Sequence, residues 1–587
     1  MLHLVKYISV SLLFISSLFP QVVHEFNVTG NSEFDKDDYF NWSGIIIGEK
    51  ISPGILDTAR IKIAAELADR GYLESKFDST GMTPLPDSPN VRINIAVNEG
   101  NPTYINHFEY SGTDSLDTLN ILPFFDFLEG EILNKYDIEQ AVTNSLNYYE
   151  NSGNPFARII INSIYVYHDS LKDKSLADVH LDFEKGKART IDKIEIVGNS
   201  TTKDYVITRE LRMSKGEKYS QLKIDELPNR LNRLRFFDPV ETPQYYVNGE
   251  GEGVLSIHVK EKQTNNFDGI IGYIPGAKQN EKGYLTGLVN VSMINLFGTG
   301  RAAAVRWQQF DRYSQEMELK YMEPWLFGYP FNLDGDFYQR KQDSSYVQRK
   351  LEGGLEFLAT ETISASAVVS TEQVIPTIKT IPVFTVFNSS SLTTGLNLKY
   401  DNRDDPYSPT EGLYFLTSYS FSRKKIFGPE EFINPVIQTN VNLQRITLDI
   451  IGYYSLFMKQ VIALGLHGKE LRGAFFEDSD LFRLGGTNTL RGYRENQFLG
   501  SRVGWTNLEY RLLLTRRTFA FLFFDTGYFY RKPEPDRDIL KQKGFKTGYG
   551  VGMNIETGVG VLSVSFALAA GDTFADGKIH FGILNEF

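Results

Sequence analysis

The chain has 587 residues and a formal net charge of −12 at pH 7. This length exceeds what one hydrophobic core usually holds together, so we expect at least two structural regions. The acidic balance argues against nucleic acid as a partner, and the absence of cysteine excludes disulfides, thiolate zinc sites and cysteine nucleophiles.

Residues 1–21 are typical of a secretory signal peptide. Lys6 precedes an apolar run from Tyr7 to Phe19, and this run is too short to hold a membrane helix comfortably. No A-x-A tripeptide fixes the cleavage site, which we place near Gln21, and no cysteine follows that would carry a lipid anchor. Later segments also lack the roughly 18 continuous apolar residues of a membrane helix.

One short sequence phrase occurs three times before residue 263. It reads EFNVTGN, HFEYSGT and KIEIVGN, and its glycines, Gly30, Gly112 and Gly198, are 82 and 86 residues apart. Each phrase is an alternating strand that is followed by a helical pattern and then by a second alternating strand, VRINIAVNEG, ADVHLDFEKG or GVLSIHVKEK. The sequence therefore predicts three α+β repeats in tandem.

These repeats resemble the polypeptide-transport-associated (POTRA) domain. We assign the first to residues 22–101, the second to 102–187 and the third to 188–263. One interpretation is that they form only a spacer. The other, which we favour, is that an exposed sheet edge in each repeat binds an extended client by adding a strand, because main-chain hydrogen bonds give affinity with little sequence demand.

From residue 264 to 587 the sequence changes to alternating segments of about ten residues, separated by Gly, Asn and Asp turns. Aromatic residues make up 13% of the chain, and alternation with aromatic girdles is typical of a transmembrane β-barrel. We predict sixteen strands, which begin near residues 266, 283, 300, 314, 331, 346, 363, 391, 412, 437, 459, 504, 518, 546, 559 and 578. The expected fold is therefore α+β tandem repeats followed by an all-β 16-stranded transmembrane β-barrel.

Strand parity then assigns each connection to one side of the membrane. With the repeats in the periplasm, every odd-to-even connection is extracellular. The segment LGGTNTLRGYRENQFLGSR, from Leu484 to Arg502, joins strands eleven and twelve and is the sixth extracellular loop. The segments NLFGTGR at 295–301 and DNRDDPYSPTEG at 401–412 fall in periplasmic turns.

The sixth loop carries Arg491, Gly492 and Tyr493, and a downstream aromatic strand carries one acid, Asp525. An arginine on a loop tip is usually a solvated charge. If this loop folds back into the lumen, however, Arg491 can form charge-assisted bidentate bonds with Asp525. Glu509 on the neighbouring strand is a second candidate acceptor, against the alternative of a generic lumenal charge. The loop would then be pinned inside the barrel.

Three features together resemble the BamA/TamA family of outer-membrane assembly factors, with a TamA-like architecture. They are the Arg-Gly-Tyr loop, the F-x-D-x-G strand from Phe523 to Gly527, and the terminal Phe587. The resemblance implies that Phe581, Ile583 and Phe587 form the C-terminal signal by which such barrels are themselves recognised during assembly. Asn585 departs from the hydrophobic residue usual at its position.

The boundary between the first and last strands, here called the seam, should be the weakest in the barrel. Gly269 and Gly272 lie in the first strand and Gly582 in the last, and glycine packs no side chain and loses more entropy on ordering. Opening the seam would expose two strand edges that can pair with an incoming strand.

Enzyme functions find no support, because the eight histidines are scattered and no HExxH, GxSxG or Walker motif occurs. We expect no catalytic residue, no metal and no cofactor. The resemblance implies that the protein assembles or inserts barrel proteins in the bacterial outer membrane, or helps to translocate them. Its partners would be outer-membrane lipids, unfolded outer-membrane protein clients, and an accessory lipoprotein or an inner-membrane-anchored protein. The alternatives are a two-partner secretion transporter, which exports one protein through its pore, and a passive porin.

Overall fold

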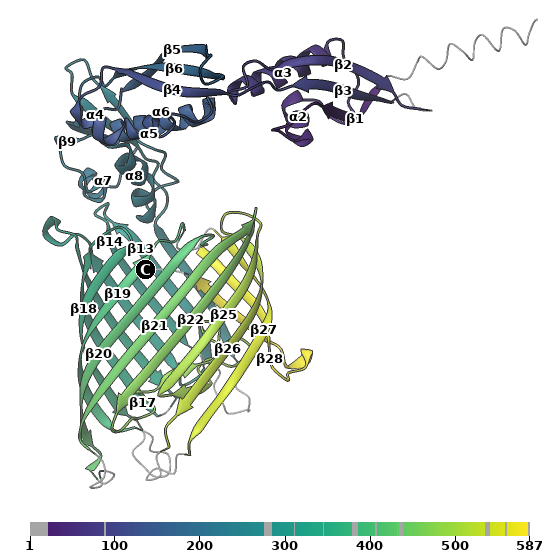
Figure 1. Ribbon diagram of the computed structural model, residues 1–587. Coiled ribbons are helices and arrows are strands. Elements are labelled where there is room, and N and C mark those ends of the chain that lie inside the picture. Colours follow the sequence, from purple (N-terminus) through teal and green to yellow (C-terminus); the bar gives the residue numbers. More distant parts are fainter. Residues whose placement is uncertain are drawn as a thin grey trace, which may run out of the picture. The chain divides into compact units, whose positions relative to one another are not determined.

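The computed structural model describes residues 21–86, 90–274, 284–309, 311–343, 345–377, 386–405, 408–430, 433, 438–533, 540–557 and 560–584. The signal peptide and Phe587 lie outside these residues, apart from Gln21. The chain divides into two compact units (Figure 1). One comprises Met1–Ile194, Ser214–Asp225 and Tyr245–Leu255, and the other comprises Glu195–Met213, Glu226–Gln244 and Ser256–Phe587.

The first repeat contains β1 (Val22–Thr29), α2 (Lys36–Ser43), α3 (Ile55–Asp69), β2 (Lys76–Pro84) and β3 (Asn90–Asn98). Its sheet has the order β1-β3-β2, with β1 parallel and β2 antiparallel to β3. Alternate residues of β3 are buried against the two helices, whose contributions to the core include Ile63 and Leu67. The alternation in VRINIAVNEG thus places one face of β3 in a core.

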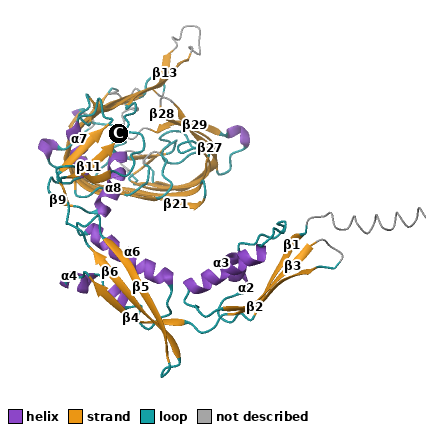
Figure 2. Cartoon of the chain, turned by 90° about the horizontal axis from the view of Figure 1, so that it is seen from above, coloured by secondary structure: helices purple, strands orange, loops and turns teal. Residues whose placement is uncertain are grey.

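The second repeat contains β4 (Thr103–Ser111), α4 (Ser115–Asn120), α5 (Pro123–Asp126), α6 (Lys135–Asn151), β5 (Arg158–Asp169) and β6 (Lys174–Glu184). Its sheet order is β4-β6-β5, with β4 parallel and β5 antiparallel to β6. Figure 2 shows α6 along this sheet, and both contribute to one core. The topology is that of the first repeat, with the last strand in the centre.

The third repeat contains β7 (Thr190–Ile191), β8 (Lys193–Val197), α7 (Asp204–Leu211), β9 (Glu217–Lys218), α8 (Gln221–Arg233), β10 (Gln244–Val247) and β11 (Gly253–His258). The order of its main sheet is β10-β11-β8, so the last strand is again central. All three segments therefore share one strand order in their main sheet.

The repeated glycines have a steric explanation. Gly30, Gly112 and Gly198 have φ angles of 83°, 74° and 100°. A Cβ atom at these positions would lie 2.2, 2.2 and 2.0 Å from the carbonyl oxygens of Val97 in β3, Phe183 in β6 and Val259, which directly follows β11. Only glycine combines this backbone conformation with so close an approach.

The residue two positions after each of these carbonyls interacts with the turn that follows the glycine. Glu99 accepts hydrogen bonds from the amides of Ser32 and Glu33, both at 2.9 Å. Glu261 accepts amide hydrogen bonds from Ser200 at 3.1 Å and Thr202 at 2.6 Å in the same way. In the second repeat the charges are reversed, because Lys185 occupies the corresponding position and pairs with Asp114.

The remaining chain forms a 16-stranded antiparallel sheet that curves into a barrel (Figure 1). The predicted number of strands is confirmed, and every predicted start lies within four residues of an observed one. The strands are β12 (Asn265–Ile274), β13 (Tyr284–Leu296), β14 (Arg301–Gln309), β15 (Gln315–Glu323), β16 (Phe331–Gln342), β17 (Tyr346–Leu358), β18 (Ile363–Pro376), β19 (Asn388–Asp401), β20 (Gly412–Gly428), β21 (Asn440–Phe457), β22 (Gln460–Gly473), β25 (Arg502–Leu513), β26 (Phe519–Arg531), β27 (Gln542–Thr557), β28 (Gly560–Ala569) and β29 (Lys578–Leu584).

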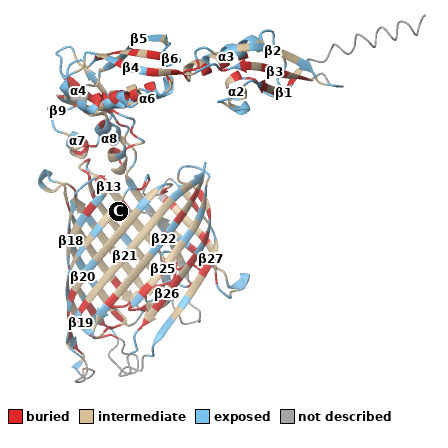
Figure 3. Ribbon diagram, in the orientation of Figure 1, coloured by how far each residue is buried: buried red, intermediate tan, exposed pale blue. Residues whose placement is uncertain are grey.

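Figure 3 shows how far the residues along the barrel strands are buried, and the two faces of the barrel wall differ in chemistry. On β19, Leu392 and Leu396 are 56% and 66% exposed. Thr393 and Asn397, each of which follows one of these leucines, turn inward, where Thr393 contacts Ser422 at 2.6 Å and Asn397 donates to Ser366 at 3.0 Å. Apolar side chains outside and hydrogen-bonded polar side chains inside are what a membrane-spanning barrel requires. In the described part of the chain no helix is long and apolar enough to cross a membrane.

Candidate functional site: the lumenal loop, the seam and the periplasmic turns

The connection between β22 and β25, residues 474–501, is here called the lumenal loop. It contains a two-stranded ribbon of β23 (Phe482–Leu484) and β24 (Phe498–Gly500). Its central turn contacts the inward faces of β25 to β29 through both side chains and main chain. The loop therefore lies against the inner wall of the barrel.

Arg491 is the centre of this contact. Its Nε and Nη2 donate to the two oxygens of Asp525, both at 2.8 Å, and its Nη1 donates to Glu509 at 2.7 Å. Asp525 is fully buried and Arg491 is 7% exposed. Asp525 also accepts the Arg491 amide at 3.1 Å and the side-chain amide of Asn507 at 2.8 Å. Both acids named from the sequence thus meet the same guanidinium.

The aromatic and glycine positions of the F-x-D-x-G strand shape the site of the arginine. The guanidinium lies 3.8 Å from the ring centroid of Phe523, a cation–π geometry. A Cβ atom on Gly527 would lie 3.2 Å from Leu484 and 3.4 Å from Leu490, so glycine leaves space for the apolar side chains of the loop. Strand β26 therefore supplies the acid, the ring and the space.

Gly492 and Tyr493 bring the loop against β27 and β28. Gly492 has a φ of 91°, and a Cβ atom there would lie 2.8 Å from the carbonyl of Leu568. A Cβ atom on Gly548 of β27 would lie only 1.9 Å from the Arg491 oxygen. Tyr493 is buried and donates its hydroxyl to the Thr547 carbonyl at 3.1 Å. Two glycines on facing segments thus permit main-chain contact between loop and wall.

A second anchor of the loop did not emerge from the sequence. Glu477 and Asp480, at the base of the loop, are buried with Lys424 of β20, whose Nζ donates to both acids, at 2.7 Å to Asp480. Nearby Arg531 of β26 pairs with Asp478 at 2.6 Å. The acidic run FEDSD was the one sequence signal of this anchor. It did not identify Lys424, because no regular spacing links the run to a lysine about fifty residues earlier.

His580 of the last strand also contacts the loop and was not singled out from the sequence. The Gly492 amide donates to its Nε2 at 3.0 Å, and the Thr487 hydroxyl lies 3.4 Å from its Nδ1. His580 is 7% exposed, while its neighbours Ile579 and Phe581 face outward at 62% and 60% exposure. The imidazole therefore lies on the lumenal face of β29.

The sheet begins at β12 and ends at β29, and in the described residues each of them has one strand neighbour. β12 pairs with β13 from Asn265 to Ile274, a stretch that includes Gly269 and Gly272. β29 pairs with β28 from Lys578 to Leu584, and Gly582 lies opposite Ser563. Of the expected C-terminal signal, Phe581 faces outward, and Phe587 and the side chain of Ile583 lie outside the described residues.

The part of the third repeat that belongs to the second unit contacts the periplasmic turns of the barrel. In the turn after β13, Gly298 accepts the Lys203 amide at 2.9 Å, and Asn295 donates to Thr202 at 2.8 Å. In the next periplasmic turn, the Trp325 indole donates to Glu210 at 2.7 Å. The NLFGTGR segment is thus a docking surface for the repeat.

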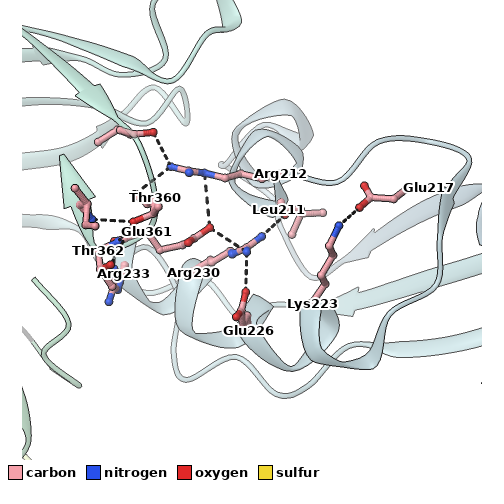
Figure 4. Close-up of polar contacts among 12 residues, drawn as sticks. Leu211, Arg212, Glu217, Lys223, Glu226, Arg230, Arg233, Thr360, Glu361 and Thr362 are labelled. Carbon is pink, nitrogen blue, oxygen red and sulfur yellow. Dashed lines mark hydrogen bonds and ion pairs between the residues drawn. The ribbon is translucent and has the colours of Figure 1, made fainter. Parts of the chain in front are cut away.

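The turn between β17 and β18 contributes one acid to this contact (Figure 4). Glu361 pairs with Arg230 at 2.9 Å and lies 3.9 Å from Arg212. Its main-chain oxygen accepts a hydrogen bond from Arg233. Three cations, one from the C-terminal cap of α7 and two from α8, therefore converge on one turn. A cavity of about 900 Å³ lies beside them, with acids such as Asp334 in its barrel wall.

The described residues hold no group of three or more His, Cys, Asp or Glu side chains placed to bind a metal ion.

Comparison with protein families gives two matches. The Omp85 superfamily domain matches residues 295–587. A POTRA model, described as a surface antigen variable number repeat, matches residues 21–100 and 189–262. The second repeat lies between the two segments that the POTRA model matches.

Two curated relatives carry the same description, "Outer membrane protein assembly factor BamA". That from Nitratidesulfovibrio vulgaris is 23% identical over 94% of this chain and 69% of its own length. That from Neisseria meningitidis serogroup B is 24% identical over 49% of this chain, which spans about a third (36%) of that relative.

The solved structure of CdiB from Escherichia coli shows a similar fold, with a TM-score of 0.51 at 14% identity, covering 90% of this chain and 98% of that one. BamA from Haemophilus ducreyi lacking POTRA domains 1–3 has a TM-score of 0.47 at 17% identity, covering 82% of this chain and 98% of the other.

Proposed function

Since the chain belongs to the Omp85 superfamily, within its BamA/TamA family, we propose that it assembles other β-barrel proteins into the bacterial outer membrane through its seam. The barrel lies in that membrane and the POTRA domains lie in the periplasm. Clients would bind first to the repeats and then pair with a strand edge at the seam. Folding of the client supplies the free energy, because its apolar face enters lipid and its main-chain hydrogen bonds close. No catalytic residue or cofactor is needed.

The observation that carries this proposal is the pair of sheet ends, β12 and β29. Each has one strand neighbour among the described residues, and an unpaired edge is a template for another strand. Arg491 fixes the lumenal loop to the inner wall. The loop therefore occupies part of the lumen, through which an exported protein would have to pass. These two features favour lateral insertion over export through the pore.

We further propose that residues 22–101, 102–187 and 188–263 are three POTRA domains that capture clients by strand addition. Strand β5 of the second domain is the best candidate edge. It lies at one end of its sheet and leaves five apolar side chains between 41% and 67% exposed, which are Ile160, Ile161, Ile164, Tyr165 and Val166. A long apolar edge of this kind favours pairing with an extended chain. Accessory periplasmic partners would act on the same domains.

Cysteine pairs across the seam test lateral insertion, since the chain has no cysteine of its own. Phe267→Cys or Gly269→Cys on β12 is combined with Ile579→Cys or Phe581→Cys on β29. Among these positions, Phe267, Ile579 and Phe581 carry outward, exposed side chains. In a pair that crosslinks, oxidation should stop client insertion into vesicles and reduction should restore it. The single-cysteine variants are the controls.

Full insertion by a verifiably crosslinked barrel would contradict lateral insertion and favour the alternative, a two-partner secretion-type transporter. Deletion of residues 188–262 tests the role of the repeats. The deleted protein should still insert as a barrel but should lose client assembly. Normal client levels would indicate a spacer or a porin.

A further inference from the structure

The last strand has a strand partner on one side only among the described residues. There β29 is paired with β28 from Lys578 to Leu584. Its other edge has no strand partner among the described residues. Contacts outside the sheet therefore contribute to holding this strand at the seam.

The lumenal loop supplies such contacts through two adjacent residues that face different strands. Arg491 binds Asp525 of β26, and the next amide, that of Gly492, donates to His580 Nε2 of β29 at 3.0 Å. A Cβ atom on Gly582, the next lumenal residue of β29, would lie 3.2 Å from the Thr487 methyl group. The turn of the lumenal loop thus connects β26, which has strand neighbours on both sides, to β29 at the seam.

We propose that His580 is a positioning residue that fastens the last strand to the lumenal loop and releases it when the imidazole is protonated. This inference rests on the proposed function for its role in client insertion, but the latch itself is a property of the isolated protein.

The hydrogen-bond chemistry fixes the protonation state that holds the strand. A main-chain amide can only donate, so Nε2 must be unprotonated to accept the Gly492 N–H. Nδ1 then carries the proton and faces the Thr487 hydroxyl at 3.4 Å, and this hydroxyl donates to Glu495 at 2.7 Å. Every group in the series has the partner its chemistry requires. Protonation of Nε2 would place two donors against each other and break the first bond.

The charged groups around His580 are of both signs. Arg491 and Glu495 face it from the loop, Asp525 faces it from β26, and Lys578 lies on its own strand. Ser565 of β28 lies opposite it in the ladder. Arg491 is already paired with Asp525 at 2.8 Å. Lys578 is paired in turn with Asp572 at 2.9 Å. No acid forms a direct ion pair with the imidazole in the described structure, so a protonated imidazole gains no new partner there.

The loop holds the two sides of the seam unequally. Across from β29, residues of the loop face β13 to β16 over a cavity of about 300 Å³, whose lining includes Leu288, Asn290 and Glu495. In the described part of the chain, the hydrogen bonds of residues 485–497 to the wall go to β25, β26, β27 and β29. Release of His580 would therefore detach β29 from the loop, while the loop remains attached to β26.

Hydrogen exchange of residues 578–584, measured by mass spectrometry on the purified full chain without client, tests the latch. His580→Leu removes the acceptor and should speed exchange of these amides about tenfold, the effect of one net hydrogen bond. His580→Gln keeps a neutral acceptor near the Nε2 position and should stay within about threefold of the unchanged protein. His467→Gln is the matched control, since His467 is lumenal but bonds Asp449 of β21.

The pH dependence provides a second measurement that does not depend on the leucine variant folding. After correction for intrinsic rates, protection of residues 578–584 should fall as the pH is lowered from 8 to 4 in the unchanged protein and stay constant in His580→Gln. Equal protection in His580→Leu and the unchanged protein, or the same pH dependence in His580→Gln, would overturn the proposal. Client insertion is measured separately. A failure of insertion with the exchange pattern intact contradicts the proposed function and leaves the latch standing.

Discussion

Replacement of Arg491 by alanine should weaken the attachment of the lumenal loop by about 3 kcal/mol. The change removes two bonds to Asp525 and one to Glu509, and breaking a buried ion pair typically costs about 3–5 kcal/mol. The lower value applies because neither acid is left without a partner. Asp525 keeps the Asn507 amide at 2.8 Å, and Glu509 keeps Arg511 at 2.8 Å.

Limited trypsin digestion of the folded protein measures this loss. Arg494 is an exposed cleavage site in the same loop, and about 3 kcal/mol corresponds to roughly a hundredfold larger population of open loop. Cleavage after Arg494 should accelerate accordingly in Arg491→Ala. Arg502→Ala is the control, because the Arg502 side chain is 63% exposed and forms a surface ion pair with Glu470, which should matter by less than about 0.5 kcal/mol.

A second variant separates the effect of the lost hydrogen bonds from that of the buried, uncompensated charge on Asp525. Adding Asp525→Asn to Arg491→Ala removes the buried carboxylate that has lost its cation, so part of the protection should return. Cleavage of Arg491→Ala at the rate of Arg502→Ala would refute the reasoning. A double variant no better protected than the single one would refute the electrostatic part alone.

Two further predictions concern the third repeat. Glu361→Ala should loosen the repeat from the barrel by about 1–2 kcal/mol, detected as faster hydrogen exchange in α8, whereas Glu226→Ala, which removes a 60% exposed partner of the same Arg230, should change exchange little. Burial raises the pKa of Glu261, but hydrogen bonds from Ser200 and Thr202 outweigh it and lower the pKa to about 2. This carboxylate should therefore contribute about 1 kcal/mol above its unfolded pKa of about 4.5 and lose it as the pH falls towards 2. Glu261→Gln should abolish this pH dependence of exchange in β11, and an unchanged profile would contradict it.

The sequence predicted the barrel well because alternation and turn residues are local signals. Sixteen strands followed from them, and parity placed the Arg491 loop on the correct connection. The largest errors in the strand starts are at β19, β21 and β27. At β19 and β27, polar residues begin the strand before the apolar alternation, whereas β21 begins three residues after the predicted start. The repeats were visible because Gly30 and its two equivalents satisfy the same steric demand each time.

The missed residues share a physical cause. His580 resembles any lumenal position of an alternating strand, and nothing local shows that it lies 3.0 Å from an amide 88 residues earlier. Lys424 and Asp480 form a buried pair across 56 residues with no motif to link them. The docking of Glu361 on three arginines depends on which turns meet the repeat. Such contacts are determined by tertiary geometry, which alternation does not encode.

The charges of Glu99, Lys185 and Glu261, which alternate along the three repeats, affect how readily the repeats exchange strands during folding. Tandem domains of one topology are prone to exchange strands with their neighbours while they fold. If the last strand of the second repeat exchanged into a neighbouring repeat, Lys185 would face the turn amides that normally donate to Glu99 or Glu261. An ammonium group and an amide are both donors, so these hydrogen bonds would be lost. The reverse exchange would place a carboxylate beside Asp114. Neighbouring repeats therefore carry opposite charges at this position. The first and third repeats carry the same charge, but the second repeat lies between them in the chain. The pattern therefore penalises the mispairings that proximity favours most.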